Sequence, residues 1–394
     1  MSIKNKSAIV GIGQTAYSKS LGKSELSVAI ECCKKAIEDA GMTAKDIDGI
    51  VRFDMDATHE DELVYALGIK ELHFFAGTPY GGGAGANSVQ LAAMAIATGQ
   101  AENVVCFRSR NRGKSSAAGA GRQSGGRPWE KQAIDVLGSA QYHIPFGLVS
   151  PVQQVGMLTR RHMHEFGTKA EHLGAIAVTQ RANAARNPDA VMREPITIED
   201  YLNARFIAEP MRLLDCCLET DGGAAVVLTS AENARNSKSP PAYILAAAQG
   251  IASMSTPMTN YYKDKDDFFN TDSSVCARLL YERAGITSDD VDVAQLYDAF
   301  STTVLLLLED YFCGRGNGGP FAESGAIGWP NGEIPMNTSG GGLSEVYLHG
   351  FNLILEAVKQ IRGTAVSQVD DVQISLYASA PPVPTSAFLL SKSP

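Results

Sequence analysis

The feature that most limits what this 394-residue chain can fold into is an internal repeat. Residues 40–48, AGMTAKDID, recur as residues 284–292, AGITSDDVD. Each copy follows a stretch with helical patterning and precedes an apolar segment, 49–53 or 293–297, that is typical of a buried strand. The glycine in each copy fits the position just after a helix, where a positive φ angle costs little.

A second repeat follows the first in each half of the chain. A triple glycine opens a predicted helix, and a predicted strand comes next. The elements are helices 81–98 and 340–361 and strands 102–107 and 371–377. Strand–helix–strand units that occur twice predict two α/β halves related by a pseudo-twofold axis.

The boundary between the halves is expected near Pro240-Pro241, which gives an N-terminal half over 1–240 and a C-terminal half over 241–394. An inserted region at about 108–230 is expected to interrupt the first half. Its predicted helices cover 151–166, 169–187 and 198–206.

Charge and cysteine usage exclude several classes of function. The formal net charge is −9, and the one concentrated basic stretch, Arg108 to Arg127, is rich in Gly and Ser. That stretch is either a surface loop or a phosphate contact, and a nucleic-acid surface is not expected. No apolar run predicts a membrane span. Seven cysteines without a CxxC spacing indicate reduced thiols in the cytoplasm, with no zinc site.

Several short segments point to one known family. They are SAIVGIG from Ser7, PFGL from Pro145, DGGAA from Asp221 and NTSGGGLSE from Asn337. Together with the repeated halves they resemble the thiolase superfamily over essentially the whole chain, in particular its sterol-carrier-protein thiolase branch. The resemblance implies a thiolase-type α/β fold: two halves, each with a mixed sheet around a buried helix, and an inserted loop domain.

The positions that carry thiolase chemistry are altered. The resemblance places Gly82 where the nucleophilic cysteine of thiolases stands, three residues before Gly85 at the start of the first buried helix. Tyr347 stands where the catalytic histidine is expected, ten residues after Asn337. Tyr297 replaces the polar residue of the third thiolase motif. Acyl transfer through an enzyme thioester is therefore not expected, because glycine carries no nucleophile.

A pocket altered in this way can still stabilise a thioester enolate with backbone donors and a proton-transfer group. The two tyrosines resemble those of the steroid side-chain-cleaving aldolases. This implies retro-aldol cleavage of a 17-hydroxy-steroid 20-carboxyl-CoA to a 17-ketosteroid and propionyl-CoA. Tyr347 would accept the hydroxyl proton and Tyr297 would act at the enolate, with the order of these roles left open. CoA is part of the substrate, and no cofactor or metal is expected.

The same resemblance implies an OB-fold accessory protein and a homodimer at the centre of an α2β2 complex. Within the site, Gly82 and Gly341 are expected to serve as oxyanion donors or to permit a close backbone approach. An unperturbed tyrosine has a pKa of about 10 and is a poor base at neutral pH. His349, Lys263 and Arg110 are candidates for lowering it.

Each of these assignments has a structural alternative. Either tyrosine can be a core aromatic, and Tyr347 is placed on a helix where it can pack on Phe351. Asp298 supports the site or, if it faces away, is structural. His349 is structural or catalytic. His143 precedes a loop at the expected pocket mouth, where a supporting or a solvated role is equally consistent with the sequence.

Two other functions remain open from the residues alone. One is a non-catalytic thiolase-like subunit that binds acyl-CoA or organises a complex, since loss of the cysteine and histidine is what decay would produce. The other is a cysteine-dependent acyltransferase that uses an unexpected thiol.

Overall fold

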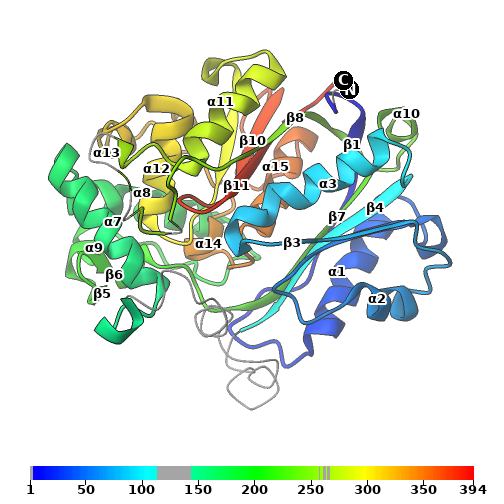
Figure 1. Cartoon of the computed structure of the whole chain (residues 1–394), viewed down its shortest axis with the longest axis horizontal. Coiled ribbons are helices and arrows are strands. Elements are labelled where there is room, and N and C mark those ends of the chain that lie inside the picture. The colour runs from blue at the N-terminus through cyan, green and yellow to red at the C-terminus, as the bar shows by residue number, and fades with distance from the viewer. Residues whose placement is uncertain (1–2, 113–142, 257, 261–262, 264–266) are drawn as a thin grey trace.

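A nine-stranded mixed sheet forms the centre of the computed structural model, which describes residues 3–112, 143–256, 258–260, 263 and 267–394 (Figure 1). The strand order is β3-β2-β4-β7-β1-β8-β11-β10-β9. The strands are β1 (Ser7–Gln14), β2 (Gly49–Phe53), β3 (Phe74–Thr78), β4 (Asn103–Asn111), β7 (Asp221–Ser230), β8 (Ala242–Gly250), β9 (Val293–Leu296), β10 (Ile374–Ala378) and β11 (Thr385–Ser391). A separate hairpin pairs β5 (Phe206–Ala208) with β6 (Met211–Arg212).

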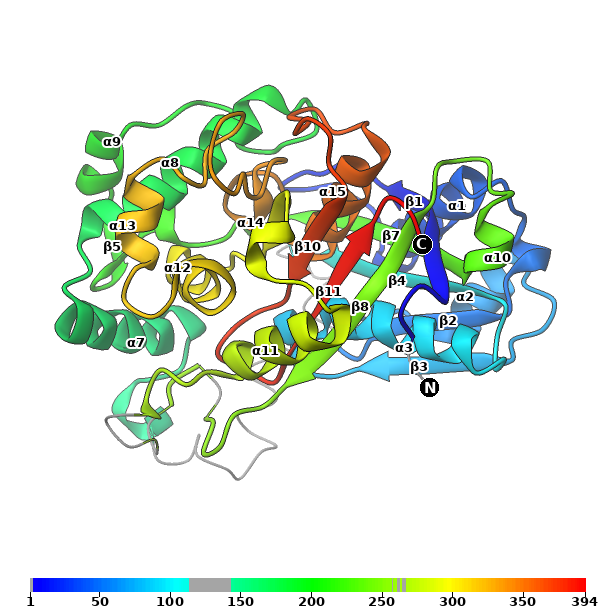
Figure 2. The same cartoon turned by 90° about the horizontal axis from the view of Figure 1, so that it is seen from above.

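Helices flank the sheet and make up much of the inserted region. They are α1 (Glu25–Asp39), α2 (Glu60–Leu67), α3 (Gly85–Ala97), α7 (Pro151–Phe166), α8 (Ala170–Arg186), α9 (Ile198–Asn203), α10 (Ala231–Ala234), α11 (Asp272–Ala284), α12 (Ser301–Leu308), α13 (Gly318–Glu323), α14 (Gly341–Ser344) and α15 (Phe351–Arg362). α1 packs on β1, β4 and β7, and α11 packs on β8 and β11. α3 and α15 each contact strands of both halves, so they lie between the two parts of the sheet (Figures 1 and 2).

The predicted pseudo-symmetry is present in the sheet. In the first half β2 runs parallel to β4. In the second half the corresponding strands, β9 and β10, also run parallel to each other. Gly41 and Gly285 end α1 and α11 with φ angles of 76° and 75°. The halves are not separate sheets, because β1 and β8 are hydrogen-bonded antiparallel and join them into one.

The helix predicted over 340–361 is broken, which corrects the expected environment of Tyr347. α14 is a single turn that ends at Ser344, and α15 begins at Phe351. His349 and Gly350 take positive φ angles of 52° and 79°, which no continuous helix allows. Tyr347 therefore lies in an irregular segment rather than on a helix.

The inserted region is shorter than predicted at both ends and is not a loop domain apart. Residues 108–111 belong to β4 and residues 221–230 form β7. The predicted helix 151–166 is α7, whereas the third predicted helix ends at Asn203. α8 packs on α12, α13 and α14, so the insertion shares the hydrophobic core of the C-terminal half. In the part of the chain that the structure describes, no helix is both long and apolar enough to cross a membrane.

Candidate active site

The structure brings the two predicted catalytic tyrosines into direct contact. Tyr297 directly follows β9, and Tyr347 lies in the break between α14 and α15. Their hydroxyl oxygens are 2.6 Å apart, and their rings meet edge to face at an angle of 67°. Tyr297 is buried, whereas Tyr347 is the one residue between 334 and 358 that is not fully buried. The pair therefore has one partner within the core and one that reaches the surface.

Tyr297 occupies the space above Gly82. A Cβ atom on Gly82 would overlap the hydroxyl and ring of Tyr297. Similarly, a Cβ on Gly350 would lie 2.9 Å from Cδ2 of Tyr297 and close to the hydroxyl of Tyr377, which also excludes a side chain at Gly85. The close backbone approach expected at Gly82 is therefore present, and it admits a phenol where thiolases are expected to hold a thiol.

The hydrogen bond between the tyrosines makes them unequal. Burial raises the pKa of Tyr347, but the hydrogen bond with Tyr297 and the charges of Arg112 and Arg110 oppose that rise. Burial also raises the pKa of Tyr297 well above its usual range, and the same hydrogen bond raises it further. Tyr347 is therefore the member of the pair that better carries negative charge.

Asp298 faces the first turn of α14. Its Oδ1 accepts the N–H of Gly342 at 2.8 Å, and its Oδ2 accepts the N–H of Leu343 at 3.2 Å. A Cβ at Gly341, whose φ is 61°, would overlap the Asp298 carboxylate, so glycine is needed there for this approach. Because Asp298 already occupies these two N–H groups, its role in the structure is that of a helix cap. An oxyanion role for Gly341 stays a prediction.

His349 lies beside the tyrosine pair and is held from β4. Its Nδ1 is 2.8 Å from Nη2 of Arg108, and its ring centroid is 4.8 Å from that of Tyr347. Arg108 is fully buried and forms an ion pair with Asp56. Burial lowers the pKa of His349 well below its usual range, and the positive charges of Arg108, Arg110 and Arg112 lower it further.

The other candidates lie in different surroundings. His143 hydrogen-bonds the carbonyl of Leu148 within its own turn, at 3.2 Å, and Lys263 donates to the carbonyl of Asn270. These contacts tie both side chains to local segments rather than to the tyrosines. Arg110 is buried on β4 and is electrostatically coupled to Tyr347, in agreement with its expected helper role.

Sequence reasoning missed Arg108, Arg112 and Asp56. The alternation Arg108-Ser-Arg110-Asn-Arg112 was a usable signal, because side chains two residues apart on a strand share a face. The loop expected over 108–127 is therefore wrong for 108–111, which form the end of β4, whereas the phosphate contact stays a prediction. Residues 113–127 lie outside the described part of the chain. Asp56 has no local motif that would pair it with Arg108.

The described residues contain no group of three or more histidine, cysteine or acidic side chains that could hold a metal ion. Cys217 lies near Tyr347, and burial raises the pKa of its thiol well above the usual range. A protonated thiol is a weak nucleophile, which argues against the cysteine-dependent acyltransferase.

Residues 255–388 match a family model described as a thiolase C-terminal domain-like family. The chain is 44% identical over 387 residues to a steroid side-chain-cleaving aldolase of Thermomonospora curvata, with 97% of each chain covered. It is 43% identical over 390 residues to a 17-hydroxy-3-oxo-4-pregnene-20-carboxyl-CoA lyase of Mycobacterium tuberculosis, with 98% of this chain and 100% of the relative covered.

A solved structure described as an Ltp2-ChsH2(DUF35) aldolase is similar over 99% of both chains, with a TM-score of 0.90 and 42% identity. A monomeric SCP2-thiolase-like protein of Mycobacterium smegmatis has a TM-score of 0.74 at 20% identity, with 99% of this chain and 78% of that chain covered. The second likeness shows the thiolase-type fold alone.

Substituting Gly82 by Ala tests the close approach of Tyr297. The added Cβ would overlap the phenol, so we expect a fall of about 1–3 kcal/mol in the free energy of unfolding. The measurement is chemical denaturation. Gly156→Ala in α7 is the control, because its Cβ would lie 3.3 Å from the nearest atom, the carbonyl oxygen of Ala208, whereas a Cβ at Gly82 would overlap the Tyr297 hydroxyl. Equal stability of the Gly82 variant and the wild type would contradict the packing described above.

Burial raises the pKa of Asp298 to about 7, against about 3.9 in an unfolded chain. The folded state then binds more protons than the unfolded state, so this group's stabilising contribution is complete below pH 4 and is lost as pH rises toward 7. Between pH 5 and 7.5 the loss is on the order of 2 kcal/mol. We expect Asp298→Asn to remove this part of the pH dependence, measured by denaturation at both pH values. An unchanged difference between the two pH values would refute the assignment.

Proposed function

Because this chain belongs to the steroid side-chain-cleaving aldolases of the thiolase superfamily, we propose that it cleaves a β-hydroxyacyl-CoA by a retro-aldol reaction. The substrate is a 17-hydroxy-steroid 20-carboxyl-CoA, and the products are a 17-ketosteroid and propionyl-CoA. The observation that carries this assignment is the 2.6 Å hydrogen bond between Tyr297 and Tyr347 above Gly82.

The reaction needs a base at the hydroxyl and an acid at the enolate. The base takes the proton of the 17-hydroxyl group, the bond between C17 and C20 breaks, and its electron pair forms the thioester enolate. A proton then adds to C20 to give propionyl-CoA. Two hydrogen-bonded hydroxyl groups can perform both transfers without a net change in the enzyme's protonation.

We assign the proton-accepting role to Tyr347. It better carries negative charge, since the positive charges of Arg112 and Arg110 favour its phenolate. As Tyr347 receives the hydroxyl proton it passes its own to Tyr297, and Tyr297 delivers one to C20. This relay resolves the difficulty of a tyrosine base, because neither side chain must ionise fully before the substrate arrives.

A thiolase mechanism does not fit the same residues. Gly82 has no nucleophile, and Tyr297 fills the space that a cysteine side chain would need. We propose that the enzyme requires no cofactor beyond the CoA that belongs to its substrate. We also propose that it works in the cytoplasm, which is supported by its seven free cysteines.

We propose that the working enzyme is an α2β2 complex with an OB-fold accessory protein. The related solved structure, whose description names a DUF35 partner, supports an accessory chain. The homodimer at the centre is supported by the surface at β3. β3 ends the sheet (Figure 2) and, within the described chain, pairs only with β2. At the opposite edge, Ala294 of β9 forms a bridge to Met336.

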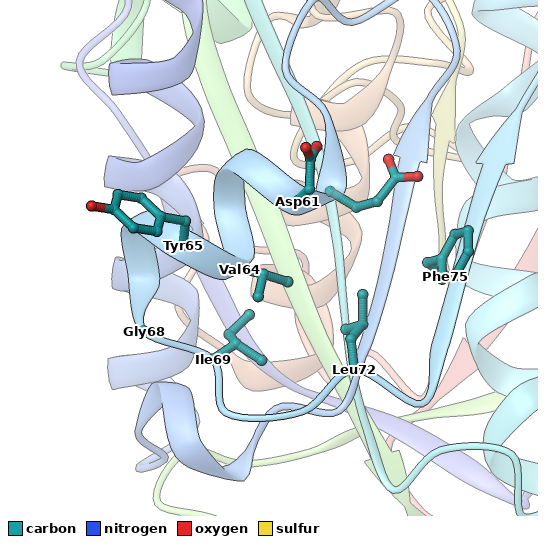
Figure 3. A pocket seen from close by; sticks show the side chains of 8 residues that line it. Asp61, Val64, Tyr65, Gly68, Ile69, Leu72 and Phe75 are labelled. Atoms are coloured by element: carbon teal, nitrogen blue, oxygen red, sulfur yellow. The ribbon is translucent and has the colours of Figure 1, made fainter.

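An apolar cleft lies beside the exposed edge. Its volume is ≈ 730 Å³, and its lining includes Val64, Tyr65 and Leu72 together with Phe75 of β3 (Figure 3). Tyr65 and Phe75 are 91% and 63% exposed, which is unusual for large apolar side chains. An uncovered edge strand of this kind readily pairs with a strand of another chain, so we place the twofold contact of the homodimer at β3.

The dimer surface is tested by Phe75→Lys. A charge at this position would have to be buried between the protomers, so we expect the mass in solution to fall by half. The measurement is light scattering after size-exclusion chromatography. Val366→Lys, at another exposed apolar residue, is the control and should leave the mass unchanged. If the Phe75→Lys variant still had the mass of a dimer, the twofold contact would lie elsewhere.

The catalytic assignment is tested by Tyr297→Phe and Tyr347→Phe, each assayed with and without the OB-fold partner. We expect kcat to fall by about 10²–10⁴-fold, since a proton-transfer group is lost, while CoA-thioester binding stays within a few-fold. Tyr281→Phe removes a hydroxyl of α11 that donates to the carbonyl of Tyr311 and is the control. The assay follows release of propionyl-CoA and ketone. Tight thioester binding by the wild type with no cleavage under either condition would favour the non-catalytic binding subunit.

A further inference from the structure

We propose that His349 is a further catalytic residue, a neutral imidazole whose Nε2–H donates a hydrogen bond to the thioester oxygen, and that Arg108 fixes it in this form. The proposal rests on the retro-aldol function. It assigns the oxyanion donor of that reaction to a side chain rather than to the start of α14, where Asp298 already occupies the N–H groups of Gly342 and Leu343.

The contact with Arg108 determines where the hydrogen of His349 lies. Nη2 of Arg108 is 2.8 Å from Nδ1 of His349, and a guanidinium group can only donate hydrogen bonds. Nδ1 must therefore accept. In a neutral imidazole the other nitrogen then carries the hydrogen, so Nε2 is a donor.

Arg108 is well fixed for this task. It is fully buried, forms an ion pair with Asp56, and stacks at 5.0 Å from the ring centre of Phe53. Together with His349, these partners restrict the position of the guanidinium. A long charged side chain buried so completely is costly unless it is paired in this way.

The donor edge of His349 points toward the reacting groups. Nε2 lies 3.9 Å from the Cβ position of Gly81, the residue before Gly82, over which the Tyr297 hydroxyl rests. The imidazole ring is also in contact with the ring of Tyr347. The His349 Nε2–H and the two tyrosine hydroxyls therefore converge on the turn at Gly81 and Gly82, where the thioester of the substrate must lie for Tyr297 to reach C20.

The surroundings keep His349 neutral. Arg108 and Arg110 of β4 and Arg112 just after it act on His349 with positive charge, Asp56 is engaged by Arg108, and burial raises the pKa of Tyr347 on the same segment. Protonating a buried imidazole beside three cations is unfavourable. His349 thus stabilises the developing enolate oxygen by a hydrogen bond without transferring its proton, and the proton relay stays with the tyrosines.

Substitutions of His349 test the donor role in the complex with the OB-fold partner. His349→Phe removes the donor, and we expect kcat to fall by about 10²–10³-fold with a smaller change in KM. His349→Gln keeps an amide N–H near the position of Nε2 and should recover part of the loss. His349→Asn suits the positive φ angle but does not reach, so it should fold well and resemble His349→Phe. His164→Gln, at an exposed histidine, is the control.

The tautomer is measured independently of turnover by ¹⁵N NMR of histidine-labelled protein, with His349→Gln used for assignment. We expect Nε2–H and an unprotonated Nδ1 from pH 5.5 to 9. In Arg108→Lys, which keeps a positive charge for Asp56 but loses the fork that reaches Nδ1, the single tautomer should be lost and kcat should fall.

Protonation of Nδ1 in the wild type, or titration of His349 within this pH range, would overturn the proposal. So would a kcat of His349→Phe within threefold of the wild type. If the wild type cleaved no substrate, the retro-aldol function itself would fail, and the NMR result would still decide whether Arg108 fixes the imidazole.

Discussion

The packing of the Tyr297 ring against the backbone of Gly82 is the constraint on which the rest of the site depends. The phenol fits only because residue 82 lacks a Cβ, and it leaves room for Tyr347 only because the chain breaks between α14 and α15. The break in turn needs a glycine at position 350, because the φ angle there is positive and because a side chain would meet Tyr297. One missing side chain and one interrupted helix thus create the tyrosine pair together.

Buried charge provides the second layer of support. Arg108 and Asp56 come from the end of β4 and the segment after β2, and their ion pair links these two parts of the first half to His349 in the second. Removing either partner would leave an uncompensated charge inside the protein, which costs several kcal/mol. Polar contacts, as well as the shared sheet, therefore connect the two halves of the chain at the active site.

The sequence predicted the regular parts of this structure better than the irregular ones. Strand 49–53 and helix 151–166 follow from apolar periodicity and capping, both of which are local. The pairing of Tyr297 with Tyr347 followed from motif spacing in the thiolase resemblance. The helix break, the capping of α14 by Asp298 and the Arg108–His349 contact depend on residues brought together from distant parts of the chain, which periodicity does not report.

Loss of the thiolase cysteine changes what the site must do electrostatically. A thiolate nucleophile needs a stabilised negative charge before the substrate binds, whereas burial here raises the pKa of both tyrosines and of Cys217. A site that disfavours standing charge is suited to moving a proton along neutral hydroxyl groups. The negative charge then appears only on the enolate, as the carbon–carbon bond breaks, and the groups that stabilise it are already in place. Replacement of the cysteine by glycine thus removes the standing thiolate from the site, while the buried arginines around it remain.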